Sequence, residues 1–265
     1  MKNLNQLNKK NISFFTGSRS EFDIFFFLIN KLSENKNIAN NIIISGSHFD
    51  KKYGYTIKYV NSKIKNLKIR NISKINIDIK RDISFISSQL ILKVSKIIKK
   101  NNIRFLILVG DRYEAMSTAL SCFLNQTKII HFHGGETTKN MIDEQFRYCI
   151  SKLSSYHFVS TQNNKINLIK NSIKKNIFVV GSMSLSNLFE KTYNQNLPFL
   201  KKSFVLFTYH PISNEEKNIS EVKEVFKALK KLEKNFNFII TSPNQDPGNQ
   251  LIFDEIESLV SKNNK

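Results

Sequence analysis

The chain has 265 residues, enough for one large domain or two small ones at about 100–200 residues each, and its 40% hydrophobic content excludes an intrinsically disordered chain. The net charge of +20 suggests an anionic partner, yet lysine is spread along the whole chain, arginine is scarce and no nucleic-acid-binding motif occurs, so we expect no nucleic-acid partner. Two cysteines disfavour a disulfide framework, and the lack of any run of about 18 apolar residues predicts no membrane span.

Apolar runs alternate with segments of helical spacing, which predicts the α/β class with a parallel sheet. The strands predicted in the first part of the chain are 12–17, 41–46, a weak one near 68–72, 103–111, 128–135, and the runs YHFVST and NIFVVGS. Helices are predicted at SRSEFDIFFFLINKLSEN, with Ser18 or Ser20 as its N-cap, and at 83–102, RYEAMSTALSCFLNQ, IDEQFRYCISKLSS and QNNKINLIKNSI. The run 103–111 shows no alternation, which is typical of a strand buried on both faces.

Most glycines fall at one kind of position, the C-terminal end of a predicted strand. The six that do so are Gly17, Gly46, Gly110, Gly134, Gly135 and Gly181. In an open α/β sheet, ligands bind outside these strand ends. Glycine lets the backbone turn and approach a ligand closely. We therefore expect a ligand site at this edge of the sheet.

The last part of the chain differs from the first, because all four prolines lie there. We predict a first Rossmann-like lobe at 1–192, a linker at 193–203 and a second lobe at 204–265. The second lobe has only two convincing strands, FVLFTYHP and FNFIITSPN, too few to bury both faces of a sheet. We therefore expect this lobe to be incomplete.

Polar motifs follow the first strand and the best-buried strand. TGSRSE places backbone amides and Arg19 at a helix N-terminus, where anions are favoured. The competing interpretation is a serine cap beside a surface arginine. GDRYEA delivers Asp111, Arg112 and Glu114 in succession after a buried strand. The alternative for Asp111 is a cap on the next helix.

The motif HFHGGETT holds two of the five histidines. His131 and His133 are expected on one face of a strand, and H-x-H with a nearby acid can bind zinc. A metal site needs a third or fourth ligand, and no second His/Cys cluster occurs, so we expect no metal. The alternative is a histidine pair with local hydrogen bonds. Glu136 follows two glycines, which predicts a loop at the ligand-facing edge.

The motif IDEQFRYC opens a helix with two acids. Asp143 and Glu144 lie in its predicted first turn, and Arg147 lies one turn further on. The helix dipole alone is the competing explanation for the acids.

Two motifs of the second lobe also follow strands. TYHP places His210 just past one strand, and TSPNQDPGN places Ser242 and Asn244 just past the other. Five strand ends thus offer polar groups toward one crevice, a convergence that indicates a functional site.

Together these motifs occur in the same order as in the hydrolysing UDP-N-acetylglucosamine 2-epimerases. The chain resembles the bacterial type from the nonulosonic (sialic or legionaminic) acid pathway, from about residue 12 to its end and most specifically at 111–161. The resemblance implies two Rossmann-like lobes with a nucleotide-sugar between them. It implies elimination of UDP across the sugar C1–C2 bond, then hydration to N-acetylmannosamine or a related sugar, without a metal or redox cofactor. It also implies a UDP-sugar or GDP-sugar substrate, a homo-oligomer and a cytoplasmic location.

The resemblance assigns roles by matching position. It implies catalytic roles for Asp111, His133, Glu136, Asp143 and His210. It implies substrate contacts for Arg19, His48, Arg112, Glu114, Glu144, Arg147, Ser242 and Asn244. The chemistry needs carboxylates and a histidine to move the C2 proton, and cationic and amide groups to hold the diphosphate.

Three departures from the family pattern stand out. His133 replaces a glutamate that is catalytic in the animal bifunctional relatives, and Asp23 replaces a small residue, which should weaken anion binding nearby. The family's later serine-rich and G-x-R-Q segments are missing, so the chain resembles a C-terminally shortened member. Two alternatives therefore stay open: an inactive nucleotide-sugar-binding fragment, and a glycosyltransferase-like enzyme.

Overall fold

The computed structural model describes residues 10–138, 141–189, 204–210, 216–244 and 248–263. The chain divides into two compact units, Met1–Thr192 and Tyr193–Lys265. Each unit has its own parallel sheet and its own hydrophobic core. The predicted linker at 193–203 lies outside the described residues.

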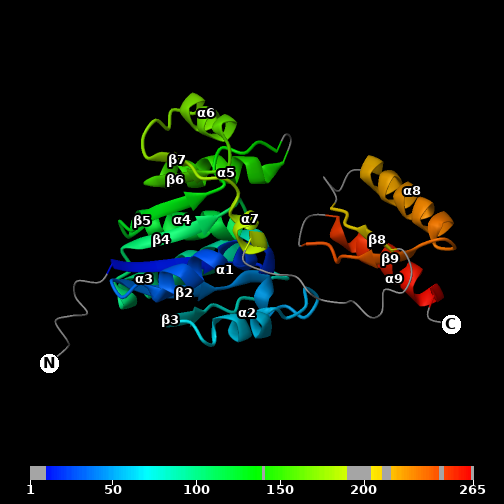
Figure 1. The fold of residues 1–265 in the computed structure, drawn as a ribbon, viewed down its shortest axis with the longest axis horizontal. Helices are drawn as coiled ribbons and strands as arrows, with labels where there is room; N and C mark the ends of the chain where they lie inside the picture. Colours follow the sequence, from blue (N-terminus) through cyan, green and yellow to red (C-terminus); the bar gives the residue numbers. More distant parts are fainter. Residues whose placement is uncertain (1–9, 139–140, 190–203, 211–215, 245–247, 264–265) are drawn as a thin grey trace. The chain divides into compact units, whose positions relative to one another are not determined.

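A seven-stranded parallel sheet forms the first unit, in the order β3-β2-β1-β4-β5-β6-β7 (Figure 1). The strands are β1 (Lys10–Thr16), β2 (Ile38–Ile44), β3 (Ile69–Lys74), β4 (Phe105–Val109), β5 (Lys128–Phe132), β6 (Tyr156–Val159) and β7 (Ile177–Val179). The chain order reverses between β1 and β4. The carboxyl ends of the strands at such a switch point are where open α/β sheets bind ligands. The predicted α/β parallel-sheet class is confirmed.

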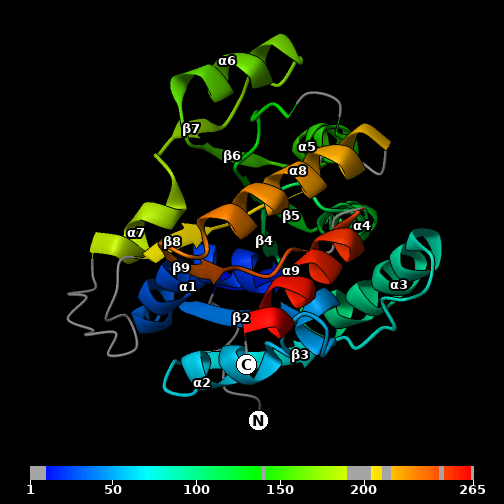
Figure 2. The ribbon, with the colours of Figure 1, turned by 90° about the vertical axis from the view of Figure 1, so that its right-hand side faces the viewer.

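Helices cover both faces of this sheet (Figure 2). They are α1 (Arg19–Glu34), the short 3-10 helix η2 (Gly46–Phe49), α2 (Ile57–Ile64), α3 (Ile83–Asn101), α4 (Tyr113–Leu124), α5 (Ile142–Leu153), α6 (Gln162–Lys170) and α7 (Met183–Phe189). In Figure 2, α3, α4 and α5 lie on one side of the strands, and α1, α2 and α7 on the other. The predicted N-cap of the first helix is confirmed as Ser18, whose hydroxyl accepts a bond from the backbone of Glu21 at 3.4 Å.

The first unit has a hydrophobic core on each face of its sheet, because side chains alternate between the two faces along each strand. On β1, Phe14 packs with the buried side chains of α1 and α2, whereas Phe15 packs with those of α3 and α4. On β4, Ile107 and Leu108 divide between the same two cores. The prediction that 103–111 is buried on both faces is therefore confirmed, and β4 anchors the loop that carries Asp111.

The second unit contains the parallel strands β8 (Phe204–Phe207) and β9 (Asn237–Ile240) with helices α8 (Glu216–Leu232) and α9 (Asn249–Asn263). Its core forms between one face of this sheet and the two helices, around Phe226 and Ile252. Leu206, on β8, is 64% exposed. Among the helices described in either unit, none has both the length and the apolarity needed to cross a bilayer.

Candidate active site

A sharp turn after β5 positions His133. Its backbone N–H donates to the carbonyl of Phe158 at 3.0 Å, and its φ of 63° lies in the left-handed region, which histidine adopts more readily than most residues. Gly135 follows with a φ of 77°, and a Cβ there would lie 2.2 Å from the carbonyl oxygen of Asn164. Only glycine fits this contact with α6, so the loop holds the imidazole in a defined place.

His133 is bonded to a carboxylate and a hydroxyl. Its Nδ1 lies 2.8 Å from Oε1 of Glu136 and 3.1 Å from Oγ of Ser160, and the Ser160 hydroxyl donates to the same carboxylate oxygen at 3.0 Å. Burial acts to raise the pKa of Glu136, but the hydrogen bond and charge of His133 outweigh it and hold this pKa below its usual value. The carboxylate is therefore ionised at neutral pH and accepts a hydrogen bond from the Nδ1–H of His133.

The other ring nitrogen of His133 has no partner. Its Nε2 is buried and makes no hydrogen bond within the described part of the chain, although the side chain as a whole is 15% exposed. A proton on Nδ1 leaves Nε2 as the nitrogen that carries the lone pair of the imidazole. A nitrogen held in this state is suited to accept a proton from a bound molecule.

Arg147 joins this group to the loop after β4. Its side chain is only 6% exposed and forms an ion pair with Asp111. It also donates to the backbone carbonyl of Glu136 at 2.7 Å and to the Thr138 hydroxyl at 3.1 Å. We call Asp111, His133, Glu136, Arg147 and Ser160 the His133 network, because these contacts connect all five.

Asp111 does not cap the following helix. The N-cap of α4 is Arg112, without a side-chain cap bond, while Asp111 pairs with Arg147. The capping alternative is therefore wrong. The carboxylate instead lies at the C-terminal end of β4 with a buried cation to balance its charge.

His131 belongs to the core rather than to the His133 network. It is fully buried, with Nδ1 3.0 Å from the Ser151 hydroxyl and Nε2 2.9 Å from the carbonyl of Gly110. Burial lowers the pKa of His131 to about 4. His131 and His133 thus make hydrogen bonds to different partners. Among the described residues there is no cluster of three or more potential metal ligands.

The loop between β1 and α1 places Arg19 in a surface cluster with Asp23 and Tyr59. Its Nε lies 3.4 Å from Oδ2 of Asp23, and its guanidinium stacks 4.8 Å from the centre of the Tyr59 ring. The Tyr59 hydroxyl in turn donates to Asp23 at 2.8 Å. The side chain of Arg19 is 61% exposed, so it faces solvent while sharing its charge with Asp23. Asp23 thus offsets part of the charge of Arg19, and its effect on anion binding stays a prediction.

A buried pair of acids lies behind this loop. Glu21 accepts a bond from the backbone of Gly17 at 2.6 Å, and burial, followed by the charge of Glu114, raises the pKa of Glu21 to about 7. Glu114 is 1% exposed, and its Oε2 lies 3.4 Å from Nε of Arg112. The buried carboxylate of Glu114 therefore balances the positive charge of Arg112.

His48 is also held inside the fold. Its Nε2 lies 2.9 Å from the Thr16 hydroxyl and its Nδ1 2.8 Å from the Thr56 hydroxyl. Burial lowers the pKa of His48 to about 4, so the ring is neutral at pH 7. Both ring nitrogens are used, and the side chain links the loops after β1 and β2.

Comparison with known proteins decides the family. The sequence profile described as UDP-N-acetylglucosamine 2-epimerase matches residues 30–264, most of the chain. The chain belongs to the UDP-N-acetylglucosamine 2-epimerase family. It is 29% identical to the GDP/UDP-N,N'-diacetylbacillosamine 2-epimerase (hydrolyzing) of Campylobacter jejuni, over 97% of this chain and 69% of that protein. It is also 29% identical to the UDP-N,N'-diacetylbacillosamine 2-epimerase (hydrolyzing) of Legionella pneumophila, over 95% of this chain and 68% of that protein.

Solved structures of the family share the fold. The UDP-GlcNAc 2-epimerase of Neisseria meningitidis bound to UDP-GlcNAc matches with a TM-score of 0.74 at 20% identity, over 95% of this chain and 70% of that one. The Methanocaldococcus jannaschii enzyme in complex with UDP-GlcNAc and UDP matches with a TM-score of 0.75 at 21% identity, over 96% and 71%. This epimerase-family chain thus spans about two thirds of the length of these relatives.

The remaining predicted site residues of this epimerase-family member lie on α5 and in the second unit. Asp143 and Glu144 are half-buried in the first turn of α5, one turn before Arg147. His210 is exposed just after β8, while Ser242 and Asn244 are exposed just after β9. Because β8 and β9 are parallel, these three residues lie at the same edge of the second sheet.

Sequence reasoning missed three residues of the first unit that lie in or beside the candidate site of this epimerase-family chain. Ser160, just past β6, completes the contacts of His133, and Thr138 adds a contact to Arg147. Glu21 was overlooked because an acid in the first turn of a helix has an ordinary explanation in the helix dipole. For Ser160, the position of a polar residue at a strand end was the available signal.

Proposed function

We propose that the chain acts as a hydrolysing nucleotide-sugar 2-epimerase on a UDP-sugar or GDP-sugar that carries an acylamino group at C2. Family membership supports the reaction, and the names of the 29% identical relatives support the substrate class. The observation that carries the proposal is the unpartnered Nε2 of His133, held in a network that extends to Asp111.

The first half of the proposed reaction removes UDP from the sugar. Nε2 of His133 takes the proton from C2, and the electrons of the C2–H bond form a C1–C2 double bond. The bond from C1 to the phosphate oxygen breaks, and UDP leaves with that electron pair. Arg19 and the N-terminal backbone amides of α1 offer positive potential for its diphosphate. The exposed groups of the second unit (His210, Ser242 and Asn244) are assigned to the nucleotide end.

The second half hydrates the unsaturated sugar. Water delivers a hydroxyl group to C1, and a proton returns to C2 on the opposite face, which inverts that carbon. Asp111 and Asp143 are assigned to these proton transfers, because both carboxylates share a neighbourhood with Arg147. We further propose a cytoplasmic homo-oligomer that supplies a sialic- or legionaminic-type pathway in bacteria.

The test is turnover with defined substrates. The chain is incubated in D2O with UDP-N-acetylglucosamine, UDP-N,N'-diacetylbacillosamine or the GDP form of the latter, and proton NMR follows nucleotide release and the free sugar. We expect the 2-epimeric sugar with deuterium at C2. Transfer to an acceptor without free epimerised sugar would indicate the glycosyltransferase alternative. Nucleotide binding without release of any sugar would indicate the inactive fragment.

A further inference from the structure

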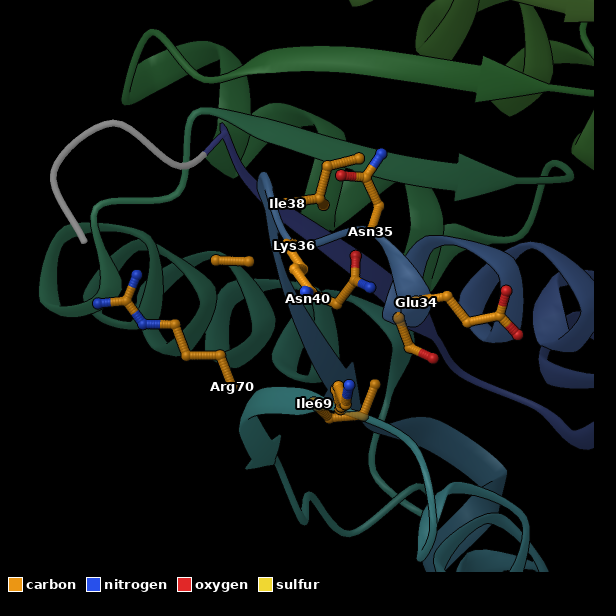
Figure 3. A pocket seen from close by; sticks show the side chains of 10 residues that line it. Glu34, Asn35, Lys36, Ile38, Asn40, Ile69 and Arg70 are labelled. Carbon is orange, nitrogen blue, oxygen red and sulfur yellow. The ribbon is translucent and has the colours of Figure 1, made fainter. Parts of the chain in front are cut away.

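A pocket lies at the edge of the first sheet opposite to the candidate active site. It has a volume of about 440 Å³, within the range of small-molecule sites, and opens between the end of α1, the start of β2 and the start of β3 (Figure 3). Strand starts form this edge, whereas the His133 network lies beyond strand ends. The pocket therefore plays no part in the proposed reaction.

Asn40 lies in the lining of this pocket with an unsatisfied amide. The residue is 1% exposed, and neither Nδ2 nor Oδ1 has a hydrogen-bond partner in the described part of the chain. Figure 3 shows Asn40 between Lys36 and Glu34, above Ile69 in this view. A buried amide without partners costs free energy, so native structures rarely leave both atoms empty.

The neighbouring asparagine shows that this chain satisfies buried amides elsewhere. Asn41 points to the opposite face of β2 and donates to Oδ1 of Asn11 at 2.5 Å and to the carbonyl of Ile12 at 2.8 Å. Its Oδ1 accepts a bond from Asn71 at 2.7 Å. Among the buried side-chain amides that the structure describes, Asn40 alone leaves both atoms without a partner, and it does so on the pocket side of the strand.

The charge around the pocket selects anions. Its lining includes Lys36, Lys68 and Arg70 but only one carboxylate, Glu34. The lysines are exposed and form no ion pair with any described residue. In Figure 3 the guanidinium of Arg70 and the carboxylate of Glu34 both extend away from Asn40. The lysines are thus the cations left to meet a ligand held at Asn40.

We propose that this pocket binds a small phosphate-bearing molecule whose planar edge both donates and accepts a hydrogen bond. The donor of that edge meets Oδ1 of Asn40, its acceptor meets Nδ2, and the phosphate meets Lys36 and Lys68. Two sources share this chemistry: the imide edge of a uracil nucleotide and the acetamido group of an amino-sugar phosphate.

A local readout tests the proposal. The δ1 methyl groups of Ile38 and Ile69, which line the pocket, are labelled with 13C and assigned through Ile→Val variants. Uridine 5'-monophosphate, N-acetylglucosamine 1-phosphate and inorganic phosphate are titrated to millimolar concentration. We expect one of the organic probes to shift both signals, and the one that does so identifies the source. An equal response to inorganic phosphate, or no response to any probe, would overturn the proposal.

Variants separate the amide from the lysines. Asn40→Leu should weaken the effective probe at least about tenfold while raising Tm, since it removes an unpaired buried amide. Asn71→Leu, on the next strand, is the matched control and should leave probe binding unchanged. Unaltered binding by Asn40→Leu would refute the role of the amide.

A surface variant covers the case in which Asn40→Leu does not fold. Lys36→Met with Lys68→Met changes exposed side chains only and should also weaken the probe at least about tenfold. Unchanged affinity in this double variant contradicts the proposal. Turnover at the active site should be the same in all these variants, so the two proposals fail independently.

Discussion

Nδ1 of His133 lies 2.8 Å from Oε1 of Glu136, and this contact fixes which nitrogen of the ring remains available for chemistry. With the carboxylate bonded at Nδ1, the buried Nε2 is the ring nitrogen without a hydrogen bond among the residues that the structure describes. The carboxylate of Glu136 therefore fixes the orientation and the tautomer of the His133 ring.

His133→Asn tests the assigned base. Asparagine tolerates the left-handed backbone at this position, so Tm should stay close to that of the parent. The variant lacks a group that takes a proton at neutral pH, so kcat should fall by about 10²–10⁴-fold. The measurement pairs steady-state kinetics with thermal unfolding. Near-normal turnover in a folded variant would relegate His133 to a structural role.

Arg147→Lys tests the link between the two loops. Lysine keeps the charge but loses the planar fork that reaches Asp111, the carbonyl of Glu136 and Thr138 together. We expect the free energy of unfolding to drop by about 2–4 kcal/mol, measured by urea denaturation. Arg104→Lys changes an exposed arginine and is the matched control. Equal effects in the two variants would show that the His133 network does not depend on the fork.

Asp23→Ser tests the cluster at the first loop. The substitution removes the ion pair between Asp23 and Arg19, together with the carboxylate that accepts a bond from the Tyr59 hydroxyl. We expect UDP to bind about two- to fivefold more tightly, in keeping with the small energy of an exposed ion pair. Asp23→Glu keeps the charge and should bind as the parent does. Calorimetric titration with UDP provides both affinities, and weaker binding by Asp23→Ser would contradict the interpretation.

Glu21 should make stability fall as pH rises. Burial and the charge of Glu114 raise its pKa from 4.5 to about 7, so between these values the folded chain binds more protons than the unfolded chain. Glu21→Gln keeps the acceptor for Gly17 and removes the charge. The variant should be more stable than the parent by up to about 3 kcal/mol at pH 8, with the gain shrinking as the pH falls from about 7 to 4.5. Exposed Glu34→Gln is the control, and a gain independent of pH would contradict this account.

His48 should act in the opposite direction. Its pKa is lowered to about 4 by burial, so between this value and 6.5 the unfolded chain binds more protons. The stabilisation is complete above pH 6.5 and is lost as the pH falls toward 4. His48→Gln, which can still bond both threonine hydroxyls, should flatten this acid limb in urea unfolding measured from pH 4 to 7. The exposed His210→Gln should leave the limb unchanged, and an unaltered limb in His48→Gln would refute the prediction.

Local sequence pattern was enough to predict the parallel sheet of the first unit. The apolar run of β4 shows no alternation, which predicts a strand covered on both faces, because a strand buried on two sides has no solvent-facing positions for polar residues. Glycines after the strands marked the ligand-facing edge. Two of them let the loops after β1 and β2 touch: a Cβ on Gly46 would lie 2.4 Å from the carbonyl oxygen of Gly17.

The sequence by itself determined the parallel α/β fold, the family and the polar loops at the strand ends, since these depend on periodicity and on motifs read in order. Only the tertiary structure decided which side chains meet. His131 and His133 stand two residues apart in one motif, yet one bonds within the core and the other turns to Glu136. Likewise the raised pKa of Glu21 depends on burial and on the charge of Glu114, which is distant in sequence. The unsatisfied amide of Asn40 depends on burial, which arises only when the whole sheet has been assembled.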